Sequence, residues 1–199
     1  MKIVQIEAIP HSYPTVGRFK FFEASDGTPT GRPSVLVKAT AEDGTIGWGQ
    51  SVPIPRWSYE SLESVAITLE KYLIPPLIGR DATDIEAAHA IMNQEIAGSF
   101  STGMPMAKAG IDLALHDLSG KLQGKSYAEL VGRPSRNAIE LSWTLNPRNL
   151  DEVEPLIETG LSRGYRHFNV KIAPDPVFDL EHCRIVKRVV PEGFRGAEA

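Results

Sequence analysis

The sequence is poor in cysteine and has neither a long apolar run nor a signal-peptide pattern. Cys183 is the only cysteine among 199 residues, which excludes a disulfide within the chain, and its amphipathic helical surroundings favour packing over a reactive thiol. No apolar run approaches the ~20 residues that span a bilayer, and the opening MKIVQIEAIPHSYP lacks an apolar signal core. We therefore expect a cytoplasmic protein that does not bind a membrane.

An excess of positive charge is also missing. The chain has 21 lysines and arginines against 25 aspartates and glutamates, and its formal net charge is −4. Nucleic-acid-binding domains concentrate basic residues on one face, whereas here they are scattered, so no nucleic-acid partner is expected. Gly44, Gly47 and Gly49 lie near a predicted strand, but no G-x-G-x-x-G motif opens a helix, so a dinucleotide site is not expected.

What the sequence does contain is, first, a pattern of short strands. The predicted strands cover residues 2–9, 34–40 and 45–50. Asp43 and Gly44 predict a type I′ hairpin turn between the second and third of them, because this pair tolerates positive φ. Residues 14–32 are rich in Gly, Pro, Thr and charge, and we expect a long loop there. The pattern is typical of a small antiparallel meander.

Three helices are predicted after the meander. Ser58 is a candidate N-cap for the first helix, the second is expected to begin at Asp84, and the third near Pro105. The third carries an apolar stripe at helical spacing, formed by Ile111, Leu115, Leu118 and Leu122. Residues 1–132 are therefore expected to form an α+β domain, an antiparallel meander plus helices.

Strands and helices alternate over residues 133–199, which predicts a parallel βαβα segment. The strand with the clearest alternation covers residues 167–172, with Phe168, Val170 and Ile172 on one face and His167, Asn169 and Lys171 on the other. We interpret the second face as the interior of a parallel barrel, which predicts that Lys171 is buried near the end of its strand. Two strands are predicted, and the closing GFRGAEA stands where a third would begin.

The segment AKAGIDLALHDLSGKLQGKSYAELVG, residues 107–132, resembles the signature helix of the mandelate racemase and muconate lactonizing enzyme family of the enolase superfamily. The resemblance implies an α+β capping domain over residues 1–132, followed over residues 133–199 by the first βα units of a (β/α) TIM-type barrel. It also implies a Mg²⁺-dependent racemase, cycloisomerase or acid-sugar dehydratase, which abstracts the proton α to a carboxylate and forms an enediolate intermediate. A small carboxylate substrate and a homo-oligomer are implied in the same way.

The resemblance assigns the catalytic base to Lys171, the second lysine of the family's Lys-x-Lys motif. The first lysine is replaced here by Asn169, which offers a substrate only a neutral amide contact. A lysine acts as a general base when its surroundings favour the neutral amine at working pH. The alternative is a structural ion pair between Lys171 and an acidic neighbour.

Five further residues are candidate substrate contacts by resemblance. Trp143 and Thr144 close the first barrel strand, at the rim where family members often contact substrate. Arg18 and Phe19 belong to the loop that corresponds to the lid over the barrel mouth, and Arg56 lies in a second specificity loop. For each of these side chains, packing within its own domain is the alternative.

Other polar residues are expected to be structural. His116 and Asp117 belong to the signature helix, where surface or structural roles are more common than acid-base chemistry. His167 shares the face of Lys171 but lies nearer the start of the strand, which favours an interior structural role.

The metal ligands implied by the resemblance are acidic residues at the ends of the third, fourth and fifth barrel strands. No metal ligand is therefore expected in this sequence, and Glu192 and Glu198 are not assigned because neither ends a predicted strand. Two hypotheses follow. The chain is the N-terminal part of a Mg²⁺-dependent enzyme, or it is a non-catalytic truncated remnant or association module that lacks the metal site.

Overall fold

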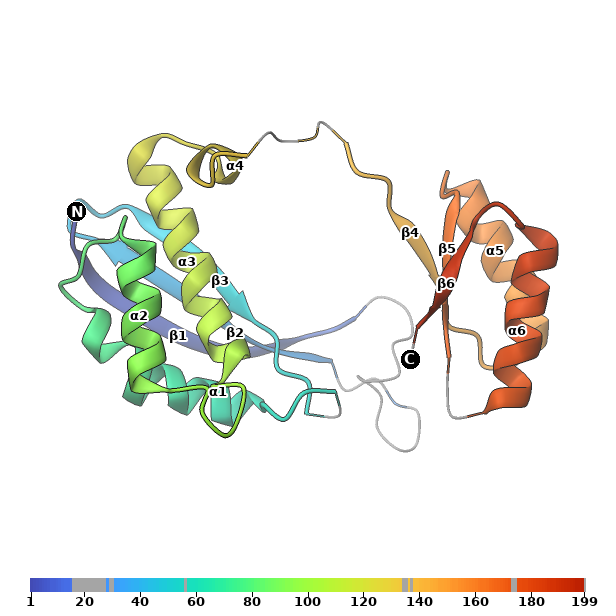
Figure 1. Cartoon of the computed structure of the whole chain (residues 1–199), viewed down its shortest axis with the longest axis horizontal. Coiled ribbons are helices and arrows are strands. Elements are labelled where there is room, and N and C mark those ends of the chain that lie inside the picture. The colour runs from blue at the N-terminus through green and yellow to red at the C-terminus, as the bar shows by residue number, and fades with distance from the viewer. Residues whose placement is uncertain are drawn as a thin grey trace. The chain divides into compact units, whose positions relative to one another are not determined.

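The computed structural model describes residues 1–15, 28, 31–55, 57–133, 136, 138–172 and 175–198. These residues form two compact units, Met1–Ser135 and Arg136–Ala199, each with a hydrophobic core of its own (Figure 1). In the part of the chain that the structure describes, none of the helices has the length and apolar character needed to cross a bilayer.

The first unit is built on an antiparallel sheet in the order β1-β2-β3. Its strands are β1 (Ile3–Tyr13), β2 (Arg32–Ala41) and β3 (Ile46–Ser51). The predicted meander is confirmed. Its hairpin lies at Asp43-Gly44, but the predicted type I′ turn is wrong. A type I′ turn needs a positive φ at both central residues, whereas only Gly44 has one (86°), and four residues link the two strands. The Asp43 side chain instead accepts a hydrogen bond from the Thr45 N–H (2.9 Å).

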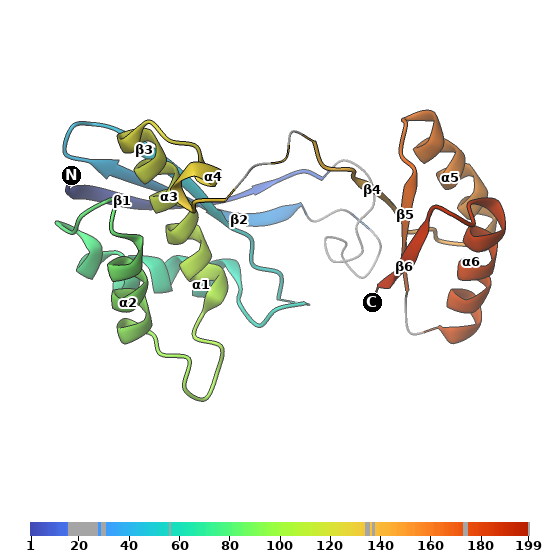
Figure 2. The ribbon, with the colours of Figure 1, turned by 45° about the horizontal axis from the view of Figure 1, so that its top comes forward.

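Helices α1, α2 and α3 cover one face of this sheet (Figure 2). The helical segments are α1 (Leu62–Thr68), a π-helical turn η2 (Leu69–Leu73), a 3₁₀ turn η3 (Pro75–Leu77), α2 (Ile85–Glu95), α3 (Pro105–Gln123) and α4 (Tyr127–Leu130). Ser61 caps α1 rather than the predicted Ser58, because Ser61 and Ser64 bond each other's backbone N–H in a capping box. Asp84 caps α2 as predicted.

The core of the first unit lies between these helices and the sheet. Alternate residues of β2, among them Val35 and Val37, are buried against the helices. The predicted stripe of α3 faces them, with Ile111, Leu115 and Leu118 buried. Each element therefore buries the face that its apolar periodicity predicts.

The second unit is a parallel sheet in the order β4-β5-β6, with α5 and α6 on one side of it (Figure 1). Its elements are β4 (Ser142–Leu145), a 3₁₀ turn η4 (Leu150–Glu152), α5 (Val153–Ser162), β5 (His167–Lys171), α6 (Pro176–Val189) and β6 (Phe194–Glu198). The expectation of only two strands is wrong, because the closing residues form β6. This strand pairs with β5. The short segment contains a glycine, and its own sequence therefore gave little indication of a strand.

Candidate functional site

The candidate site lies on the face of the parallel sheet opposite α5 and α6. In β5, Phe168 and Val170 are buried, whereas His167, Asn169 and Lys171 are partly exposed on the other face. Lys171 is the last residue of β5, at the carboxyl end where barrel enzymes place their catalytic groups. Its partial exposure corrects the expectation of a buried lysine, because the three described strands form an open sheet and not a closed barrel.

Strand register groups the candidate residues. Thr144 pairs with Asn169, and Lys171 pairs with Glu198 of β6. Partners in adjacent strands direct their side chains to the same face, so the hydroxyl of Thr144, the amide of Asn169 and the amino group of Lys171 share one surface. All three groups can donate hydrogen bonds, so together they match the needs of a carboxylate.

Trp143 lies on the opposite face, the one covered by helices. Its register partner is Phe168, and a Cβ added to Gly160 of α5 would lie 2.9 Å from the indole ring. The Tyr165 ring centroid is 5.0 Å away, and the guanidinium carbon of Arg163 lies 5.2 Å from the centre of the Trp143 ring. This placement turns Trp143 away from Lys171 and argues for packing rather than substrate contact.

The remaining predicted residues divide into two sets. His167 pairs with Glu140, with 3.4 Å between Nδ1 and the carboxylate oxygen, at the amino end of β5 and away from the end that carries Lys171. Arg18, Phe19 and Arg56 lie outside the described residues, and their substrate contacts stay predictions.

Two acidic residues that the sequence left unassigned lie in or beside β6. Glu198 is the last residue of β6, so the reason for leaving it unassigned, that it ends no strand, is wrong. Glu192 lies in the turn before β6. Among the described side chains no cluster of three or more His, Cys, Asp or Glu residues could hold a metal.

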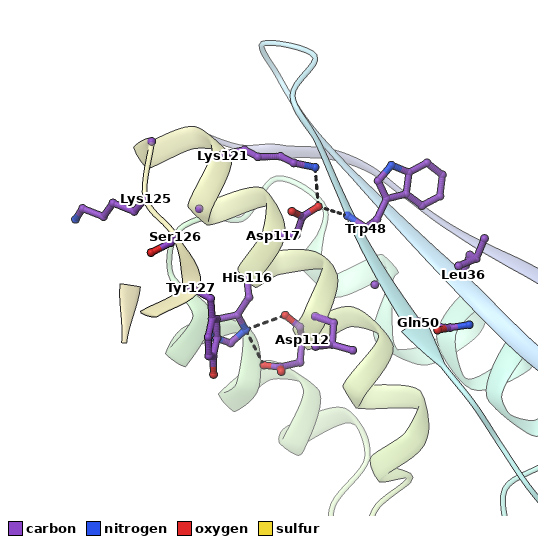
Figure 3. Close-up of a pocket in the computed structure, with 14 residues that line it drawn as sticks. Leu36, Trp48, Gln50, Asp112, His116, Asp117, Lys121, Lys125, Ser126 and Tyr127 are labelled. Carbon is purple, nitrogen blue, oxygen red and sulfur yellow. Dashed lines mark hydrogen bonds and ion pairs between the residues drawn. The ribbon is translucent and has the colours of Figure 1, made fainter. Parts of the chain in front are cut away.

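The signature helix carries polar contacts of its own, in the first unit (Figure 3). The Asp112 carboxylate lies 2.5 Å from His89 Nε2 and 3.3 Å from His116 Nδ1, and His116 also contacts the Asp112 carbonyl oxygen (2.9 Å). These contacts join α2 to α3. Asp117 accepts hydrogen bonds from the Trp48 N–H (2.8 Å) and from Lys121 Nζ (2.7 Å). His116 and Asp117 therefore both make structural contacts.

Glycines allow α3 to lie unusually close to β3. A Cβ added to Gly47 would lie 2.3 Å from the Ala114 carbonyl oxygen, and one added to Gly49 would lie 2.1 Å from the Gly110 carbonyl oxygen. A Cβ added to Gly110 would lie 2.4 Å from the Ser51 hydroxyl oxygen. The glycine spacing seen in the sequence thus serves contact between strand and helix.

Glu60 is a buried carboxylate that the sequence did not single out. It is 1% exposed, and its two oxygens accept hydrogen bonds from the N–H groups of Met106 (2.7 Å) and Ala107 (3.0 Å). These donors belong to the first turn of α3, where N–H groups have no partner within the helix. Glu60 therefore caps the signature helix from a loop that is distant in the sequence. A carboxylate at this place also interacts favourably with the positive end of the helix dipole.

Comparison with known proteins decides the family. Residues 15–132 match the family model described as the N-terminal domain of mandelate racemase and muconate lactonizing enzyme. The chain belongs to this family. As a member it is 36% identical over 194 residues to a chloromuconate cycloisomerase of Cupriavidus necator, covering 94% of this chain and 50% of the relative. It is 29% identical to an N-succinyl-L-Arg/Lys racemase of Bacillus cereus, covering 85% of this chain and 44% of that protein.

Solved structures of the mandelate racemase and muconate lactonizing enzyme family agree with this fold. The muconate lactonizing enzyme from Pseudomonas putida superimposes with a TM-score of 0.83 at 29% identity, covering 98% of this chain and 52% of that one. The Bacillus cereus N-succinyl Arg/Lys racemase gives a TM-score of 0.82 at 28% identity, over 98% of this chain and 52% of that one. The chain thus spans about half the length of these relatives, and it corresponds to their N-terminal portion with the capping domain of the enolase superfamily.

Proposed function

We propose that the chain is the N-terminal part of an enzyme that abstracts the proton α to a carboxylate, with Lys171 as the base. Residues 1–132 would be its capping domain and residues 133–199 the start of its barrel. The relatives include cycloisomerases and a racemase, so we favour these two reactions over dehydration. The substrate would be a small carboxylate.

The observation that carries this proposal is the position of Lys171. It ends β5 on the face opposite α5 and α6, beside Asn169 and Thr144. Asn169 and Thr144 would hold the substrate carboxylate through hydrogen bonds, and a neutral Lys171 would accept the proton from the neighbouring carbon. A lysine that accepts a proton as the amine returns it as the ammonium, so one residue serves both directions of the transfer.

Mg²⁺ is part of the proposal. When bound, it would supply positive charge beside the substrate oxygens, which stabilises the charge that develops as the proton leaves. Its ligands would be acidic residues at the ends of the third, fourth and fifth barrel strands, as the family resemblance implies.

Proton exchange in the complete enzyme tests the proposal. The relatives suggest muconolactone and N-succinyl amino acids as first compounds to test, because each carries a proton on the carbon next to a carboxylate. Exchange of that proton is followed by NMR in D₂O. Lys171→Ala is expected to lower the exchange rate by about 10³-fold, within the range for loss of a general base. Lys187→Ala, which removes an exposed lysine of α6, is the matched control and should leave the rate unchanged.

Two results would contradict the proposal. Normal exchange in a folded Lys171→Ala enzyme would remove Lys171 from the mechanism. Absence of any exchange in the complete wild-type protein, with Mg²⁺ and a panel of carboxylates, would favour the non-catalytic remnant or association module.

A further inference from the structure

β3 is one of the two edge strands of the antiparallel sheet. Its pairing with β2 is fixed by the Ala41 N–H, which donates to the Thr45 carbonyl oxygen (2.9 Å). Backbone groups alternate along an antiparallel pair, so Ile46, Trp48 and Gln50 direct their N–H and C=O groups away from β2. A row of such groups is a template on which a strand of another chain can pair.

Two of these outward groups are covered by one ion pair on α3 (Figure 3). The Trp48 N–H donates to Asp117 Oδ2 (2.8 Å), and Lys121 Nζ donates to the Ile46 carbonyl oxygen (2.9 Å). Asp117 and Lys121 also bind each other (2.7 Å), one helical turn apart. The N–H of Trp48 and the carbonyl oxygen of Ile46 on the strand edge are thus both hydrogen-bonded to side chains of α3.

The close contact of α3 with β3 makes this arrangement possible. Because Gly47 and Gly49 present no side chain to the helix, α3 lies near enough for Asp117 and Lys121 to reach the strand edge. Both side chains of the pair are more than a third exposed. Exposed ion pairs contribute little to folding stability, so a stabilising role alone explains this arrangement poorly.

The edge next to the ion pair borders an apolar hollow. Trp48, Gly49 and Gln50 line it together with the apolar side chains of Leu36, Leu113 and Tyr127, and its volume is about 960 Å³. Trp48 is 44% exposed and Leu113 is 51% exposed. A strand that paired with β3 would therefore gain apolar burial as well as backbone hydrogen bonds.

We propose that the Asp117–Lys121 pair is an edge guard, which prevents β3 from pairing with β3 of a second copy of this chain. A second copy is the matching partner because two β3 strands related by a two-fold axis run antiparallel and present the same groups to each other. Each copy would bring its own Trp48 side chain to the contact. The guard keeps the Ile46 and Trp48 backbone groups occupied, so such a pair gains too few hydrogen bonds to persist.

The test compares self-association of the 199-residue chain with and without the guard. Asp117→Ala/Lys121→Ala removes both charges together, so neither is left unpaired. Glu181→Ala/Arg184→Ala removes an exposed ion pair of α6 and is the matched control. Sedimentation velocity over a concentration series should show an association constant raised by about tenfold or more for the first variant, and unchanged for the control.

A third variant tests whether association uses β3. Adding Gln50→Lys to the guardless chain places a charge on the strand edge and should return association to the wild-type value. Lys121→Ala alone, which uncovers only the Ile46 carbonyl, should give a smaller rise and decides the test if the double variant does not fold. The proposal is overturned if a folded guardless chain associates like the wild type, or if Gln50→Lys leaves its association unchanged.

Discussion

Alanine at Gly49 is expected to destabilise the first unit by about 3 kcal/mol, the upper part of the usual range for overpacking. Its Cβ would lie 2.1 Å from the Gly110 carbonyl oxygen, about 1.3 Å inside the 3.4 Å at which ordinary contact begins, and 2.5 Å from the Ala114 nitrogen. Both atoms belong to the α3 backbone, so no rotamer change relieves the overlap and the helix must move. A gap of 0.5–1 Å already loses a quarter to a half of the dispersion energy between packed groups, and Leu115 and Leu118 are buried on α3.

Thermal unfolding followed by circular dichroism measures this effect. Gly98→Ala is the matched control, because the nearest atom to its added Cβ, the Ser101 carbonyl oxygen, is at an ordinary 3.5 Å. At about 3–4 °C per kcal/mol for a unit of this size, Gly49→Ala should lower the melting temperature by about 10 °C, and Gly98→Ala by less than about 2 °C. Equal melting temperatures for the two variants would refute the argument from close packing.

Two further changes test buried polar groups. Glu60→Ala should lower the free energy of unfolding by about 3 kcal/mol, because it removes the acceptor of two N–H groups at the start of α3. Glu60→Gln should lower it by less, as measured by urea unfolding. Equal losses of stability would rule out capping by the carboxylate. Burial lowers the pKa of His182 below its ordinary value of 6.5, against an opposing effect of Asp179. Because the unfolded chain then binds the proton more readily, the second unit should lose stability as the pH falls below about 6.5, and His182→Leu should remove that loss; the same pH dependence in both chains would contradict this.

The sequence predicted best what depends on near neighbours. Asp84 caps α2 as expected, because its side chain bonds an N–H only three residues along the chain, and Asp175 caps α6 in the same way. Ser58 and Ser61 are equally good caps by type, and the choice between them depends on Ser64, which completes the box with Ser61. Glu60 was missed because the N–H groups that it binds lie 46 and 47 residues away, and no local pattern joins them.

The candidate site shows a second reason for success and failure. The alternation of β5 predicted correctly that Lys171 and Asn169 share a face. The same period-two rule separates Trp143 from Thr144, so the sequence already contained the signal that only one of them faces Lys171. β6 gave no comparable signal, because five residues that include a glycine form a strand only through pairing with β5.

The separate core of the first unit has a consequence for how the protein is made. Among the described residues, the buried side chains of its hydrophobic core lie between Ile3 and Leu118, and the strand pairs and helix caps that hold them also lie within the first 135 residues. This unit can therefore fold on the ribosome while later strands are still being translated. The parallel sheet differs, since each strand must wait for the helix and strand that follow it. Synthesis would thus present a finished first unit before Lys171 has any neighbouring strand on its β6 side.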